Sequence, residues 1–240
     1  MMTRCGVTLG SLAQGKSKRR RVLGCHRSYC PACARLRRNR IFSRMRPWVE
    51  GQMGLTGGAA FLTLSLPESD GRVIDRLARL SKEVRSIPTA RDWRRGFCPD
   101  IGVVMTFEIG PGSNRTGYVH AHLFIYSGSR EALGAFLNWL RSRWSRRVKR
   151  DLIEGAGLAI LGPNPEEWAP RLHYLLKGNR IALDWPLPLV EEVLEAITSG
   201  KRLFSVWGLA KRRGGWTRAR FAGNIQAFHP SLMGKLKVAG

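Results

Sequence analysis

The segment from Tyr118 to Tyr126 alternates between two kinds of side chain, and this alternation most restricts the fold that the chain can adopt. Successive side chains of a β-strand point to opposite faces, so His120 and His122 share one face while the apolar residues around them share the other. The apolar face predicts burial against a core. Neutral imidazole is the commonest side-chain metal ligand, so two imidazoles on one rigid strand supply half of a site for a divalent cation. The alternative is a pair of ordinary, partly buried histidines.

A second strand is predicted at 101–109, and the turn-forming segment 110–117 joins it to the histidine strand. Strands joined by a connection of this length usually pair antiparallel, so we expect a hairpin. In the expected register, Glu108 lies on the same face as the two histidines. A carboxylate beside two imidazoles suits Mg²⁺ or Mn²⁺, so Glu108 is the predicted third ligand. The alternative is that Glu108 is a solvent-facing strand residue.

Periodicity in the rest of the chain predicts an α+β fold. An apolar run with partial alternation predicts a strand at 59–66, and a short apolar run predicts another at 157–162. Helical spacing of apolar residues predicts helices at 73–86, 131–150 and 165–177. We divide the chain into three segments. Residues 1–55 form a cysteine-rich basic segment, residues 56–180 form a central segment that contains the histidine strand, and residues 181–240 form a basic C-terminal extension.

Four cysteines near the N-terminus form a candidate zinc site. Cys30 and Cys33 stand in a Cys-Pro-Ala-Cys sequence, which is the tight thiolate turn that a tetrahedral zinc site uses, and Cys25 lies five residues before it. Cys5 is the predicted fourth ligand, and His26 is a less favoured one. Zinc would stabilise a segment that is too polar to fold alone. The alternative is a set of reduced thiols without a metal.

The charge of the chain predicts a polyanionic partner. The sequence has 41 Lys and Arg against 17 Asp and Glu, a formal net charge of +24. Neutralising phosphates releases condensed counterions, so nucleic acid is the first candidate. No apolar run is long enough to span a membrane and no signal peptide is recognisable, so we expect a cytoplasmic protein.

Two groups of arginines are predicted to contact DNA. The first lies on a basic helix expected at 34–49, and the second lies near the end of the helix expected at 131–150. The first group is Arg35, Arg37, Arg38 and Arg40, and the second is Arg143, Arg146 and Arg147. A charge run is usually only a solvated helix face, but nearly all of these charges share one sign, which stabilises a helix poorly and attracts phosphate well.

Tyr174 and Lys177 are a candidate catalytic pair. They lie three residues apart on a predicted helix and are therefore neighbours on one face. A phenol can attack a phosphodiester in line, an ammonium can offset the charge that develops, and a divalent cation can polarise a phosphate oxygen. Taken alone, Tyr-x-x-Lys is a common accident of sequence. The order of strand, His-x-His strand, helix and Tyr-x-x-Lys helix gives it weight.

Three motifs and the cysteine segment before them resemble those of HUH endonucleases, in particular single-tyrosine initiators of rolling-circle replication. The motifs are Phe61-Leu-Thr-Leu-Ser65, His120-Ala-His122 and Tyr174-Leu-Leu-Lys177. The resemblance implies an antiparallel sheet of about five strands flanked by helices. It also implies that His120 and His122 bind the metal, that Tyr174 is the nucleophile and that Lys177 assists it.

The chain departs from the family pattern at two places. Many relatives have another histidine where this chain has Tyr118, and some have an acidic residue just before the nucleophile, where this chain has Arg171 and His173. The third metal ligand and the residue that ends the reaction therefore stay open, with Glu166 and Glu167 as alternatives.

The predicted function is that of a site-specific single-strand DNA nickase and strand transferase. It starts rolling-circle replication on single-stranded or hairpin origin DNA in a bacterial cell or a phage-infected host. The expected partners are a host helicase and polymerase. The alternatives are a single-tyrosine transposase and a zinc-ribbon nucleic-acid-binding protein without catalysis.

Overall fold

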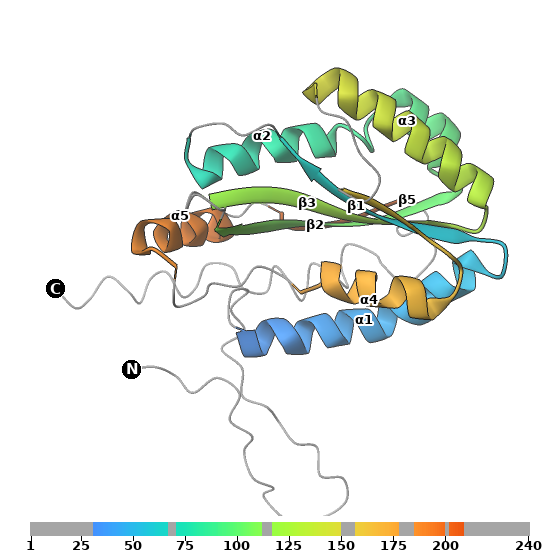
Figure 1. The fold of residues 1–240 in the computed structure, drawn as a ribbon, viewed down its shortest axis with the longest axis horizontal. Coiled ribbons are helices and arrows are strands. Elements are labelled where there is room, and N and C mark those ends of the chain that lie inside the picture. Colours follow the sequence, from blue (N-terminus) through green and yellow to red (C-terminus); the bar gives the residue numbers. More distant parts are fainter. Residues whose placement is uncertain are drawn as a thin grey trace, which may run out of the picture.

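The computed structural model describes residues 31–66, 71–111, 117–149, 157–177, 185–199 and 202–208 (Figure 1). Its helices are α1 (Pro31–Met53), α2 (Val73–Arg85), α3 (Arg130–Val148), α4 (Pro165–Leu175) and α5 (Leu187–Thr198), with a π-helical turn η1 (Trp93–Phe97). Its strands are β1 (Gly58–Ser65), β2 (Ile101–Pro111), β3 (Gly117–Ser127), β4 (Leu158–Leu161) and β5 (Phe204–Gly208). The predicted α+β class is confirmed.

The strands within the described residues form one five-stranded antiparallel sheet in the order β4-β1-β3-β2-β5. The histidine strand β3 is central, because it pairs with β1 on one side and with β2 on the other. The hairpin of β2 and β3 predicted from the sequence is confirmed. Its register places Glu108 directly opposite His120, and Thr63 of β1 lies opposite His122. Directly paired residues share a face of the sheet, so these four side chains lie on the same side.

Helices cover both faces of the sheet (Figure 1). On one face, α2 and α3 pack on the apolar side chains that alternate with the histidines, such as Ala121 and Leu123 of β3. On the other face, α1 and α4 pack on Phe61 and Phe124. The residues of β3 are buried on both sides, except that Tyr118 and His120 are half-exposed. The face that carries the histidines is therefore closed over one end of β3 and open at the other.

Two glycines of β2 make room for two tyrosines of β3. Gly102 pairs with Tyr126, and Gly110 pairs with Tyr118. A Cβ atom at Gly102 would lie 2.1 Å from the Tyr126 ring, and a Cβ atom at Gly110 would lie 2.8 Å from the Tyr118 ring. A larger residue at either position would have to displace the ring. Gly110 thus allows the Tyr118 ring to lie across β2, where its hydroxyl reaches Glu108.

The ends of α1 and α4 differ from the prediction in ways that affect the core and the site. α1 extends beyond 34–49 to Met53, because Met45, Val49 and Met53 bury their side chains in the core between α1, α4 and the sheet. α4 ends at Leu175 instead of continuing through Lys177, which corrects the prediction. The backbone of Leu176 leaves the helical region, and the Lys177 N–H donates to the Tyr174 carbonyl oxygen at 2.9 Å in a tighter turn.

The described parts of the first and third segments pack against the central one. α1 contacts α4 on the sheet, and β5 extends the sheet by pairing with β2. α5 contacts α2, and its Glu192 carboxylate accepts the backbone N–H of Val73 at 2.9 Å, where an acid stabilises the start of a helix. None of the helices in the described ranges is both long and apolar enough to cross a bilayer.

Candidate active site

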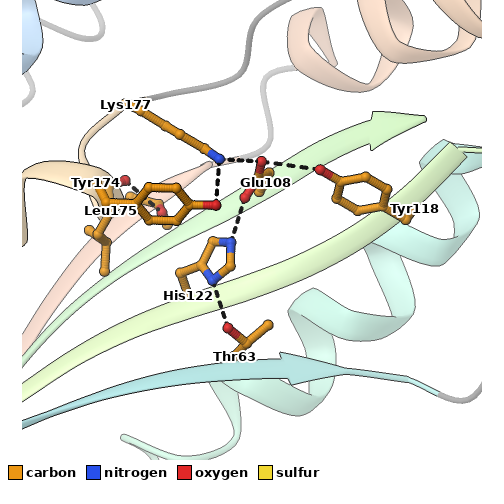
Figure 2. A network of polar contacts seen from close by, with 8 residues as sticks. Thr63, Glu108, Tyr118, His122, Tyr174, Leu175 and Lys177 are labelled. Carbon is orange, nitrogen blue, oxygen red and sulfur yellow. Dashed lines mark hydrogen bonds and ion pairs between the residues drawn. The ribbon is translucent and has the colours of Figure 1, made fainter. Parts of the chain in front are cut away.

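Four elements bring polar side chains together where the C-terminal end of α4 passes over the sheet. β1 supplies Thr63, β2 supplies Glu108, and β3 supplies Tyr118 and His122; the end of α4 and the turn after it supply Tyr174 and Lys177 (Figure 2). The strands are neighbours in the sheet, so the spacing of these groups follows from the register. The helix is held in place because the Thr106 hydroxyl of β2 donates to the Leu175 carbonyl oxygen at 3.1 Å.

His122 is held by partners on both ring nitrogens. Its Nδ1 lies 3.0 Å from the Thr63 hydroxyl, and its Nε2 lies 2.5 Å from Oε2 of Glu108. The carboxylate can only accept, so Nε2 carries a proton in this contact, and the hydroxyl can pair with Nδ1 whether or not that nitrogen is protonated, because it donates or accepts. Phe61 stacks on the imidazole with ring centroids 5.5 Å apart. The residue is 6% exposed, so its orientation is set by the fold.

Glu108 is the centre of the polar network. Its second oxygen, Oε1, accepts from Lys177 Nζ at 2.6 Å and from the Tyr118 hydroxyl at 3.1 Å (Figure 2). Burial alone would raise the pKa of Glu108, but hydrogen bonds from His122 and Lys177, together with their charges, outweigh it and lower the pKa to about 2. The carboxylate is therefore charged at neutral pH and orders the groups around it.

Tyr174 presents its phenol to solvent beside this network. The residue is 44% exposed, and Lys177 Nζ donates to its hydroxyl oxygen at 2.7 Å. The ammonium also lies 3.9 Å from the centroid of the Tyr174 ring. On the inner side the ring meets His122 edge-on, with centroids 5.7 Å apart. Lys177 thus connects an accessible phenol to a partly buried carboxylate.

The imidazoles of His120 and His122 and the Glu108 carboxylate are suitable ligands for a divalent cation. Their arrangement in the described residues is not that of a complete metal site. His120 lies on the same face as His122, with ring centroids 6.3 Å apart, and it is half-exposed. In the part of the chain that the structure describes, no group of three or more His, Cys, Asp and Glu side chains is placed to hold a metal as it stands. The Thr63 hydroxyl at His122 Nδ1 holds the ring orientation, as the outer partner of a metal-binding histidine does. A cation at Nε2 and Glu108 would replace the shared proton.

The other predicted ligands are the four cysteines and two glutamates. Cys5, Cys25 and Cys30 fall outside the described residues, whereas Cys33 is buried at the start of α1. Glu167 accepts the Gly162 backbone N–H at 2.7 Å at the other end of α4, two turns from Tyr174, and the exposed Glu166 lies beside it. The structure does not bring these two glutamates to Tyr174.

The two predicted groups of arginines lie on different sides of the sheet. Arg35, Arg37, Arg38 and Arg40 belong to α1, which shares the face of the histidines and contacts α4. There Asn39 lies 3.1 Å from Nε2 of His173, the neighbour of Tyr174. Arg143, Arg146 and Arg147 belong to α3, which covers the opposite face (Figure 1). The sheet therefore separates the second group from Tyr174.

Two residues of this cluster, Thr63 and Tyr118, are not among the site residues predicted from the sequence. Both share the face of the histidines by strand alternation, and this is the signal that would have found them. Strand alternation does not predict the contact between Lys177 and Glu108, because Lys177 lies beyond the end of α4.

Comparison with known proteins adds no relative. No protein-family model, curated protein or solved structure matches this chain. The site is therefore interpreted from its own chemistry, and the resemblance of its motifs stays a prediction.

The ionised state of Glu108 should contribute to stability in a defined pH range. Its pKa falls from the ordinary value of 4.5 to about 2 on folding, so its contribution is present above pH 4.5 and is lost as the pH falls toward 2. We expect the difference in unfolding free energy between the wild type and Glu108→Gln to be about 3 kcal/mol at neutral pH. Urea unfolding from pH 7 down to pH 2 measures it. A difference that stays constant across this range would contradict the assignment.

Proposed function

We propose that this protein is a single-strand DNA endonuclease and strand transferase of the HUH type, which starts rolling-circle replication through a 5′-phosphotyrosine intermediate. The observation that carries the proposal is the accessible Tyr174 hydroxyl, 2.7 Å from Lys177 Nζ and beside the imidazole of His122. An exposed phenol held by an ammonium next to a histidine–carboxylate pair is suited to attack on a phosphodiester.

In the proposed reaction the Tyr174 oxygen forms a bond to phosphorus, and the bond between phosphorus and the 3′ oxygen breaks. The phenolic proton is transferred in net to the leaving 3′ oxygen, so the products are a tyrosine-linked 5′ phosphate and a free 3′ hydroxyl. Lys177 orients the phenol and offsets the negative charge on the phosphoryl group. The reverse reaction, with a new 3′ hydroxyl as attacking group, rejoins the strand.

Mg²⁺ or Mn²⁺ is the proposed cofactor of this site. His120, His122 and Glu108 would hold the ion, which when bound polarises a non-bridging phosphate oxygen. Thr63 keeps His122 oriented toward it, and Lys177 shares the Glu108 carboxylate. Zn²⁺ at Cys5, Cys25, Cys30 and Cys33 remains part of the proposal, as do single-stranded or hairpin origin DNA and a host helicase and polymerase as partners.

The proposal is tested with a pool of random-sequence single-stranded oligonucleotides that carry a fluorophore at the 3′ end. The protein retains the piece with the 5′ phosphate, so with Mn²⁺ a labelled adduct should survive denaturing electrophoresis. Sequencing the DNA recovered from the adduct would identify the cleavage site, and an origin or a transposon end would separate an initiator from a transposase. A non-catalytic binder would give no adduct under any of these conditions.

Arg171 should bind a phosphate next to the scissile one. It lies three residues before Tyr174 on α4, its side chain is exposed, and its guanidinium carbon lies 5.9 Å from the centroid of the Phe61 ring. We expect Arg171→Ala to raise the KM for cleavage by about 10–100-fold through loss of a charged hydrogen bond, with little change in kcat. Steady-state cleavage of the selected oligonucleotide measures both constants.

A chemical double-mutant cycle makes this prediction specific. Replacing single phosphates of the oligonucleotide with neutral methylphosphonates should weaken wild-type binding at one flanking position, and Arg171→Ala should be insensitive at that position. Arg171→Lys, the matched control, should keep part of the effect. Strictly additive losses at every position would show that Arg171 contacts no phosphate.

A further inference from the structure

A second cationic surface lies on the face of the sheet opposite the candidate active site. It is formed where the C-terminal halves of α2 and α3 meet, and we call it the α2–α3 basic patch. It consists of Arg79, Lys82, Arg143, Arg146, Arg147 and Lys149. Side-chain contacts join the helices here. Arg147 Nε donates to Glu83 Oε2 at 2.6 Å, and Arg143 donates to the carbonyl oxygen of Ser86, the residue after α2, at 3.3 Å.

Positive charge in this patch exceeds what its acids can neutralise. The acids that act on Arg143 are Glu83, which already binds Arg147, and Asp92. Burial lowers the pKa of Arg143, and the charges of Arg147 and Arg146 lower it further. Like charges held this close repel one another, and this repulsion destabilises the folded protein. A bound polyanion would reduce the repulsion.

Among the described residues, the aromatic ring that the patch contacts is already packed against other rings. This ring is the indole of Trp139, which packs on Phe136 with centroids 5.7 Å apart and on Phe97 at 5.4 Å. The Arg143 guanidinium carbon lies 5.6 Å from the centroid of the same ring. Proteins that hold single strands combine positive charge with exposed aromatic platforms. This surface is therefore suited to contact a sugar–phosphate backbone and not unstacked bases.

The position of the patch decides what it can contact. Tyr174 lies on the side of α1 and α4, and the sheet stands between it and the patch (Figure 1). A strand bound at Tyr174 reaches the patch only by passing around the edge of the sheet. A duplex presents phosphates of two strands at high density, and its stacked bases need no aromatic partner. We propose that the α2–α3 basic patch binds the backbone of duplex DNA that flanks the single-stranded cleavage site.

The inference rests on the proposed function only in taking DNA as the polyanion, and its test needs no cleavage. Binding is measured by fluorescence anisotropy in EDTA, with a single-stranded oligonucleotide and with a hairpin that carries the same single strand beside a stem. The variant is Lys82→Glu with Arg146→Glu, two exposed residues, one on each helix. The matched control is Arg40→Glu with Arg44→Glu, two exposed residues of α1.

We expect the patch variant to lose about tenfold or more in affinity for the hairpin, with a salt dependence of log K that is smaller by about 2, since each phosphate contact contributes about 0.9. Its affinity for the single strand should change less than about twofold. The α1 control should weaken both DNAs to the same extent. Equal losses on both DNAs for the patch variant, or no loss on either, would overturn the inference.

Charge reversal of two residues can also unfold a protein, so circular dichroism melting accompanies the binding measurement. Lys82→Gln with Arg146→Gln is the second variant, and it should show the same preference for the hairpin with a smaller effect. If no covalent adduct is ever found but the hairpin preference depends on the patch, the proposed enzymatic function fails and the duplex surface stands. If a covalent adduct forms but the hairpin preference does not depend on the patch, the enzymatic function stands and the duplex surface is refuted.

Discussion

Replacing Tyr174 with phenylalanine should abolish the covalent DNA adduct and lower cleavage by at least about 10³-fold, because the substitution removes the nucleophilic oxygen. Binding of single-stranded DNA should change little, since the ring and its contact with His122 remain. The measurement is adduct formation with the 3′-labelled oligonucleotide and Mn²⁺ in a single turnover, together with anisotropy in EDTA. The two readouts separate loss of chemistry from loss of binding.

Tyr118 is the rival nucleophile and provides the control. It is half-buried and donates its hydroxyl to Glu108 at 3.1 Å. Burial and the Glu108 charge raise the pKa of Tyr118 well above its usual range, which disfavours the phenolate. Peptide mass spectrometry of the adduct should therefore find the DNA on Tyr174, and Tyr118→Phe should still form it. An adduct on Tyr118, or one that persists in Tyr174→Phe, would refute the assignment.

Replacing His122 with alanine should lower both the cleavage rate and the affinity for Mn²⁺. Each loss should exceed the factor of about 10–100 that is typical when an outer-shell partner of a metal ligand is removed. The substitution should also destabilise the fold by about 1–3 kcal/mol, because the Thr63 hydroxyl and the Glu108 carboxylate lose their partner in a largely buried place. Single-turnover cleavage across a Mn²⁺ titration, isothermal titration calorimetry and urea unfolding measure the three effects.

Thr63→Val is the matched control for His122→Ala. It keeps the shape of the side chain and the imidazole, and it removes only the hydroxyl that lies 3.0 Å from Nδ1. We expect a loss of about 10–100-fold in cleavage, smaller than that of His122→Ala. If Thr63→Val cost as much as His122→Ala while both proteins stayed folded, the imidazole would have no direct role. Full activity of His122→Ala with Mn²⁺ would have the same meaning.

The pairing of β2 with β3 could be predicted because it depends on short-range patterns. Alternation in β3 placed His120 and His122 on one face, and the length of the turn after β2 indicated an antiparallel hairpin that also placed Glu108 there. The class of the fold follows from the same patterns. The end of α4 could not be predicted, because nothing in its residues distinguishes a last helical turn from the tighter turn that ends at Lys177.

The sequence by itself determined which residues share a strand face and that Tyr174 stands near Lys177, since both follow from the repeat of the backbone. Only the tertiary structure decided that Lys177 binds Glu108, that Thr63 supports His122, and that α3 places its arginines across the sheet from Tyr174. These relations join residues far apart in the chain. They depend on strand order and on which face each helix covers, and local sequence patterns carry no information about either.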